Sequence, residues 1–150
     1  MNKKQKEIAI LEKFSDVAAL AGIRGEIDEN GDNFVAGFEL DQGRSQMVYV
    51  KPLPEAIKGQ DAVCIYSPCR KVEKGFFKGL SKDQSHELLK LNSQLIVARY
   101  GIIEFPEGFL VMASVDALLD TLDASELEAF VWYVALAADS YERKFGGDDF

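Results

Sequence analysis

The sequence is poor in the residues on which catalytic and metal sites usually depend. Among its 150 residues there is one histidine, His86, and there are two cysteines, Cys64 and Cys69. Two cysteines are too few for a disulfide scaffold, and a Cys-x4-Cys spacing without a second pair of ligands is a weak zinc pattern. Cys64 falls in an apolar run, which favours a small core residue. We therefore expect no metal and no cofactor.

Recognisable ligand-binding motifs are also missing. The sequence contains no phosphate loop and no dinucleotide-binding fingerprint. Asp28, Asn30, Asp32 and Glu39 match four positions of a calcium loop. The sixth position, however, is Asn33 instead of glycine, and a strand is predicted where a helix should follow. We interpret this match as a coincidence.

Long apolar segments are absent as well. Residues 1–7 are charged and lack the apolar centre of a signal peptide. No run reaches the roughly 18 apolar residues that a membrane span requires. These observations predict a cytoplasmic protein with reduced thiols and no membrane span.

Positive charge is scarce, and its distribution is uneven. Seventeen basic residues against twenty-five acidic ones give a net charge of −8, which repels phosphate and argues against a nucleic-acid partner. Residues 101–142 contain no lysine or arginine. The acidic residues in this stretch are Glu104, Glu107, Asp116, Asp120, Asp123, Glu126, Glu128, Asp139 and Glu142. A solvated acidic face and a surface for a basic partner both explain this pattern.

The composition is that of a globular protein, with 47% apolar and 28% charged residues. This length predicts one domain with a substantial core, over residues 1–145, followed by a flexible acidic tail over 146–150. Short loops at 41–44 and 106–108 require antiparallel neighbours. We therefore predict an α+β fold: an antiparallel sheet of about five strands with three helices, in the order α-β-β-β-α-β-β-α. The expected helices are 3–21, 82 to about 96, and 125–144; the expected strands are 34–40, 46–51, 62–67, 97–105 and 109–115.

The last predicted helix has two apolar stripes. Ser125 and Glu128 form a possible capping box at its start. One stripe consists of Leu127, Phe130, Val131, Val134, Ala138 and Tyr141. The opposite patch consists of Ala129, Trp132, Tyr133 and Leu136. A helix on the outside of a monomer needs only one such stripe, so we expect the first to face the sheet. Either the first helix or a partner would cover the second, which is rich in the aromatic types found at binding hot spots.

Two further positions are candidates for partner contacts. The strand at 109–113 is apolar at every position, whereas a sheet with one wet face should alternate. One side of this strand should therefore meet a helix, and we expect Leu110 and Met112 to contact a partner. In the preceding helix Asn92 lies within an apolar face. Because a buried amide without partners is costly, we expect Asn92 to hydrogen-bond to backbone.

A family resemblance is carried by the second half of the chain. Its segments are LLKLN at 88–92, FPEGFLV at 105–111, LLDTLDASEL at 118–127 and AAD at 137–139. Together with the predicted element order, these resemble the YbjN family of bacterial sensory-transduction regulators, within the type III secretion chaperone-like fold. The first half of the chain matches only by element order. The resemblance implies an α+β sandwich that forms dimers, binds polypeptide and contributes no catalytic residues.

The sequence thus predicts a non-catalytic protein-binding module, chaperone-like or regulatory, that works as a homodimer and is not an enzyme. Two alternatives remain open at this point. The first is a module for an anionic ligand that uses the basic segment 70–82. That segment contains Arg70, Lys71, Lys74, Phe76, Phe77, Lys78 and Lys82. The second is a small enzyme that uses His86 with nearby carboxylates.

Overall fold

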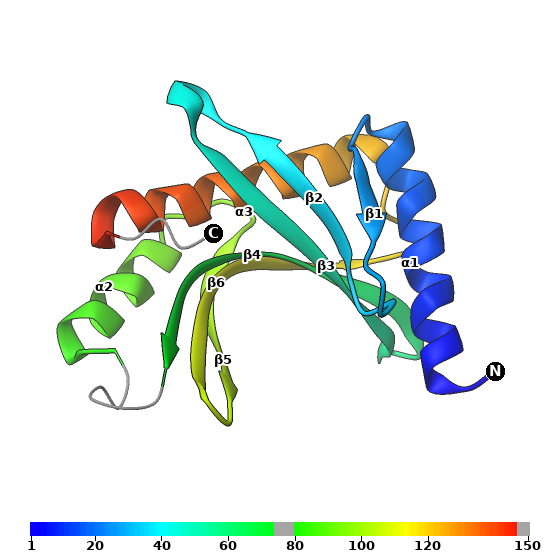
Figure 1. The fold of residues 1–150 in the computed structure, drawn as a ribbon, viewed down its shortest axis with the longest axis horizontal. Helices are drawn as coiled ribbons and strands as arrows, with labels where there is room; N and C mark the ends of the chain where they lie inside the picture. The colour runs from blue at the N-terminus through cyan, green and yellow to red at the C-terminus, as the bar shows by residue number, and fades with distance from the viewer. Residues whose placement is uncertain (74–79, 147–150) are drawn as a thin grey trace.

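The computed structural model describes residues 1–73 and 80–146, which form three helices and one six-stranded antiparallel sheet (Figure 1). The elements are α1 (Lys3–Leu20), β1 (Gly25–Ile27), β2 (Phe34–Glu39), the 3-10 turn η1 (Asp41–Gly43), β3 (Ser45–Ile57), β4 (Gln60–Glu73), α2 (Lys82–Asn92), β5 (Arg99–Phe105), β6 (Gly108–Leu118) and α3 (Ala124–Phe145). The strands lie in the order β1-β2-β3-β4-β6-β5, and each neighbouring pair is antiparallel. The predicted α+β class and antiparallel pairing are confirmed.

The predicted strand number and some predicted boundaries are wrong. The sheet has six strands instead of about five, because Gly25–Ile27, for which no strand was predicted, pairs with β2. Strand β3 continues through Pro52, which the sequence suggested as its end. Since β2 pairs with β3 only as far as Val50, this proline lies where one side of β3 has no neighbouring strand. Strand β4 continues past Pro68 by means of a β-bulge.

Side-chain caps fix where the helices begin. Ser81 accepts a hydrogen bond from the Gln84 N–H, and the Gln84 side chain accepts one in return from the Ser81 N–H, as the sequence predicts. The N-cap of helix α3 lies two residues earlier than expected. Its N-cap is Asp123 instead of Ser125, and the Asp123 carboxylate accepts a hydrogen bond from the Glu126 N–H at 2.7 Å. The carboxylate also complements the positive end of the helix dipole.

Helix α3 crosses one face of the sheet and closes the main hydrophobic core (Figure 1). Leu127, Val131 and Val134 are buried there in one cluster with Ile65 of β4 and Val111 of β6. The predicted core stripe is therefore placed correctly at these positions. Phe130 is only half-buried, because it lies at the rim of the stripe.

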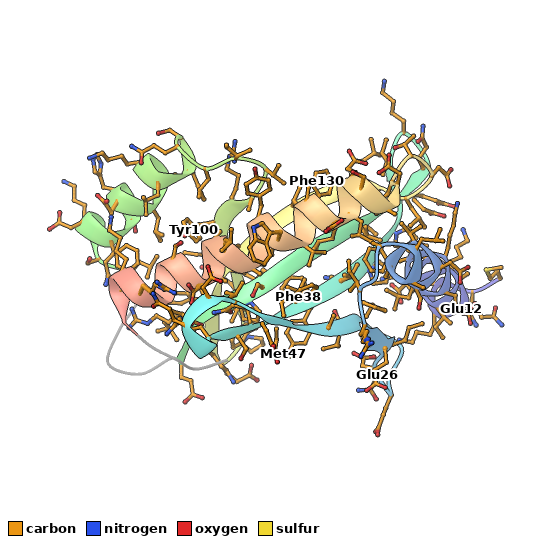
Figure 2. All side chains as sticks on the ribbon, turned by 90° about the horizontal axis from the view of Figure 1, so that it is seen from above. Glu12, Glu26, Phe38, Met47, Tyr100 and Phe130 are labelled. Carbon is orange, nitrogen blue, oxygen red and sulfur yellow. The ribbon has the colours of Figure 1, made fainter. Side chains whose placement is uncertain are left out.

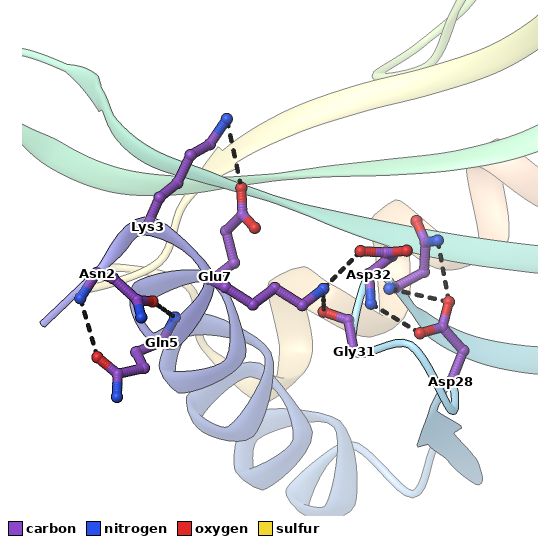
Figure 3. Close-up of polar contacts among 9 residues, drawn as sticks. Asn2, Lys3, Gln5, Glu7, Asp28, Gly31 and Asp32 are labelled. Atoms are coloured by element: carbon purple, nitrogen blue, oxygen red, sulfur yellow. Dashed lines mark hydrogen bonds and ion pairs between the residues drawn. The ribbon is translucent and has the colours of Figure 1, made fainter.

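Helix α1 covers the other end of the same face. Phe14 packs edge-on against Phe34 of β2, with ring centroids 5.2 Å apart. Beyond the helix, the Asp28 carboxylate accepts hydrogen bonds from the N–H groups of Asp32 and Asn33 (Figure 3). The Lys4 ammonium group donates to the Gly31 carbonyl oxygen at 2.9 Å. The Lys4 contact connects α1 to the loop before β2. The Asp28 carboxylate, in turn, stabilises the backbone turn of that loop.

A buried ionic cluster joins the end of α3 to the β2–β3 hairpin. Arg44 hydrogen-bonds to both Asp139 and Glu142, and the Gln46 side-chain amide donates to Glu142 at 2.8 Å. Arg143 adds an ion pair with Asp139 at 2.8 Å. Two members of the acidic stretch are thus buried and neutralised, so they do not contribute to an acidic surface. Sequence analysis missed this cluster. Asp139 and Glu142 are adjacent to Ala138 and Tyr141 of the predicted apolar stripe, and this position could have indicated buried carboxylates that need basic partners.

Two substitutions test how α3 packs. We expect Leu127→Ala, at a fully buried side chain, to lower the free energy of unfolding by about 2–5 kcal/mol. Phe130→Ala should cost less than the roughly 3–5 kcal/mol of a fully buried phenylalanine, because Phe130 is half-exposed to solvent. Urea denaturation of both variants measures the difference. A larger loss for Phe130→Ala would contradict this packing.

Candidate binding surfaces

The six candidate partner residues lie on two sides of the sheet. Val111 and Ala113 of β6 face α3 and are fully buried. Side chains alternate along a strand, so Leu110 and Met112 point to the opposite face, away from α3. The structure therefore separates these two residues from the candidates on α3.

Of the four α3 candidates, Trp132 alone lines a hollow beside the C-terminal end of α1. The Trp132 side chain is 45% exposed. The hollow has a volume of about 240 Å³ and is lined by Ala21, Gly22, Ile23, Phe38, Glu128, Val131 and Trp132. Figure 2 shows Phe38 and Phe130 on opposite sides of α3. The residues that follow α1 therefore lie beside Trp132 but leave it exposed. Ala129 is exposed, and Tyr133 and Leu136 are half-buried.

The open face of the sheet carries a second group of apolar side chains. Tyr49 of β3 and Tyr66 of β4 stack there with ring centroids 5.5 Å apart. Met47, on the same face, lies two residues before Tyr49, and Leu110 and Met112 extend the group across β6. All five side chains are partly exposed. A sheet face that meets only water would carry mostly polar side chains. On this face, three neighbouring strands, β3, β4 and β6, carry apolar or aromatic ones instead.

A third surface is the apolar groove between α2 and the edge strand β5. The groove has a volume of about 300 Å³ and is lined by Leu80, Ser85, Leu88, Leu89, Asn92, Tyr100, Gly101 and Ile102. Asn92 of α2 bonds to the backbone of Tyr100 in β5 and so joins the two walls of the groove. The prediction that Asn92 hydrogen-bonds to backbone is confirmed. The Asn92 Oδ1 atom accepts a hydrogen bond from the Tyr100 N–H at 2.7 Å, and Nδ2 donates to the Tyr100 carbonyl oxygen at 3.0 Å. Sequence analysis identified Asn92 but missed the groove.

The candidate chemical groups do not converge on one place. Burial, with a smaller effect from Asp116, raises the pKa of the Cys64 thiol to about 12. Burial, with a smaller effect from Glu142, raises the pKa of Cys69 to about 12 as well. Both thiols are therefore protonated at neutral pH and are weak nucleophiles. His86 is exposed on α2. Within residues 1–73 and 80–146, no three His, Cys, Asp or Glu side chains assemble into a possible metal site.

The basic segment 70–82 lies only partly within the described residues, because 74–79 fall outside them. Burial raises the pKa of Tyr141, and a hydrogen bond from Arg70 opposes that rise. The Lys71 ammonium group lies 5.9 Å from the centroid of the Phe105 ring. Both described cations at the start of the segment thus contact aromatic side chains of the protein itself. Of the predicted tail, the structure describes only Gly146; residues 147–150 also lie outside the described part.

Removing the Asn92 bridge provides a test of the α2–β5 arrangement. Asn92→Ala leaves the N–H and carbonyl groups of Tyr100 without this partner, and we expect a loss of about 1–3 kcal/mol of unfolding free energy. Asn92→Asp keeps an acceptor for the Tyr100 N–H and should lose less at neutral pH. Urea denaturation compares the two. Equal stability of the alanine variant and the parent would contradict the bridge.

Burial of Tyr66 predicts a loss of stability at alkaline pH. Burial, followed by the effect of Cys64, raises the pKa of Tyr66 from 10.0 to about 12. As the pH rises, the unfolded chain therefore releases the Tyr66 proton before the folded protein does. The contribution of this group to the free energy of unfolding is complete below pH 10 and is lost as the pH rises toward 12. Tyr66→Phe should reduce the fall in unfolding free energy between pH 8 and pH 11, measured by urea denaturation. An unchanged fall would show that Tyr66 does not contribute.

In the part of the chain that the structure describes, no helix combines the length and apolar character needed to cross a membrane. No protein-family model matches the sequence, and no curated protein matches it significantly.

Proposed function

We propose that the protein is a non-catalytic protein-binding module, chaperone-like or regulatory, that acts as a homodimer in the cytoplasm. The observation that carries this proposal is the exposed Trp132 in the hollow between α1 and α3. Large aromatic side chains in such hollows are typical anchors of protein interfaces. The resemblance of residues 88–139 to the YbjN family supports the same function. We propose the type III secretion chaperone-like fold as the fold family on the same basis.

The charge around Trp132 favours a basic polypeptide with apolar side chains. Glu128 lines the hollow, and Glu126 is exposed two residues earlier on α3. No lysine or arginine occurs in α3 before Arg143. A basic segment would therefore meet opposite charge beside an apolar anchor site, which speeds association and selects the partner.

Two designed peptides and a matched pair of variants test this proposal. An amphipathic peptide of leucine and lysine should bind and shift the Trp132 fluorescence emission to shorter wavelength. The same peptide with glutamate in place of lysine should bind at least tenfold more weakly, because its charge is that of the protein. Labelled-peptide anisotropy extends the measurement to variants without the tryptophan.

We expect Trp132→Asp to weaken binding of the lysine peptide about tenfold or more while the protein stays folded. Ile57→Asp is the control, because Ile57 is 43% exposed, close to the value for Trp132, but lies at the end of β3. Circular dichroism checks the fold of both variants. Equal weakening by the two substitutions, or equal affinity for the two peptides, would remove the Trp132 surface from the proposal.

A further inference from the structure

The hollow beside Trp132 combines aromatic, apolar and acidic side chains in a small space. Phe38 and Trp132 contribute aromatic rings to its lining, and Glu128 contributes a carboxylate. Glu128 and Trp132 stand at positions i and i+4 of α3, so they are neighbours on one face of the helix. The volume of about 240 Å³ is below the roughly 300–1,000 Å³ of pockets for drug-sized ligands. The hollow therefore suits one side chain of a partner better than a whole small molecule.

The C-terminal end of α1 borders this hollow through Ala21 and Gly22. The last turn of α1 contains no basic residue. The N–H groups of the three residues after the helix bond to carbonyl oxygens within that turn. In the part of the chain that the structure describes, the carbonyl oxygens of Leu20 and Ala21 accept no hydrogen bond. Because the C-terminal end of a helix carries partial negative charge, it attracts a cation to the side of the hollow opposite α3.

The charged side chains around the hollow are mainly acidic. Glu39 follows Phe38 in the sequence, Glu126 lies two residues before Glu128, and all three glutamates are exposed. Arg24 is the one basic residue adjacent in sequence to a lining residue, and it is exposed and does not line the hollow. Within residues 1–73 and 80–146, Glu128 forms no side-chain hydrogen bond or ion pair. The hollow thus has negative charge and an available carboxylate beside its aromatic rings.

We propose that this hollow binds an arginine side chain of the polypeptide client. This inference rests on the proposed function and names the residue by which the client is recognised. The guanidinium group is planar and weakly hydrated, so it stacks on the Trp132 ring. Its five N–H groups donate to the Glu128 carboxylate and to the carbonyl groups at the end of α1. The aliphatic stem of the arginine covers the apolar part of the lining, at Phe38 and Val131.

Other occupants match fewer of these features. A lysine ammonium group is compact and strongly hydrated, so it covers less of the aromatic surface. A quaternary ammonium group would attract the rings but has no N–H to donate to Glu128. An apolar side chain would fill the hollow but would remove water from the Glu128 carboxylate without replacing its hydrogen bonds. Arginine supplies an apolar stem, a planar face and hydrogen-bond donors together.

Replacing lysine by arginine in the amphipathic test peptide measures this preference. We expect the leucine–arginine peptide to bind about fivefold more tightly than the leucine–lysine peptide, a difference of the size that a cation–π contact provides. Citrulline keeps the shape of arginine without its charge, and a citrulline peptide should bind about tenfold more weakly than the arginine peptide. Labelled-peptide anisotropy at one ionic strength measures all three. Equal affinity for the arginine and lysine peptides would overturn the inference and leave the proposed function standing.

Variants of the protein locate the preference at the hollow. Trp132→Leu keeps an apolar side chain but removes the ring, and Glu128→Gln keeps an acceptor but removes the charge. Both should reduce the arginine preference to less than about twofold. Glu126→Gln is the matched control, because it removes the same charge from α3 at an exposed side chain that does not line the hollow. It should leave the ratio of the two affinities unchanged. A preference that survives Trp132→Leu, or that Glu126→Gln reduces as much as Glu128→Gln, would overturn the inference.

The remaining outcomes separate this inference from the proposed function. Circular dichroism checks that each variant is folded, and Glu128→Gln, at an exposed position, decides the result if Trp132→Leu does not fold. Trp132 is the only tryptophan, so its fluorescence reports on the hollow directly. Emission that moves to shorter wavelength with rising protein concentration alone would show that a second copy fills the hollow, and would overturn the arginine site. Absence of binding by both the arginine and the lysine peptide would overturn the inference and the proposed client site together.

Discussion

The contact between α3 and the sheet is the constraint on which the rest of the structure depends. Leu127, Val131 and Val134 bury their side chains in one core cluster with residues of β4 and β6, and this removes their apolar surface from water. Beyond them, Arg44 and Gln46 hold the carboxylates of Asp139 and Glu142 at the end of the same helix. The apolar part supplies stability. The ionic part fixes where α3 lies along the β2–β3 hairpin, because a buried carboxylate requires its partners.

One consequence of this packing is that α1 and α3 cover the same face of the sheet. The opposite face retains Tyr49, Tyr66 and Met112 as partly exposed side chains. Helix α2 lies beside the edge strand β5 and joins it through Asn92. This bridge satisfies the N–H and carbonyl groups of Tyr100 and joins α2 to the sheet.

The sequence by itself determined the fold class, the antiparallel hairpins, the start of α2 and the buried stripe of α3, because each follows from local periodicity, caps or loop length. It also predicted that Asn92 bonds to backbone. Only the tertiary structure decided that β3 and β4 continue through Pro52 and Pro68, since this depends on which neighbouring strands are present. It also separated Leu110 and Met112 from Trp132, and brought Arg44 to Asp139. Such long-range pairings arise when the whole core closes, and no local pattern in the chain encodes them.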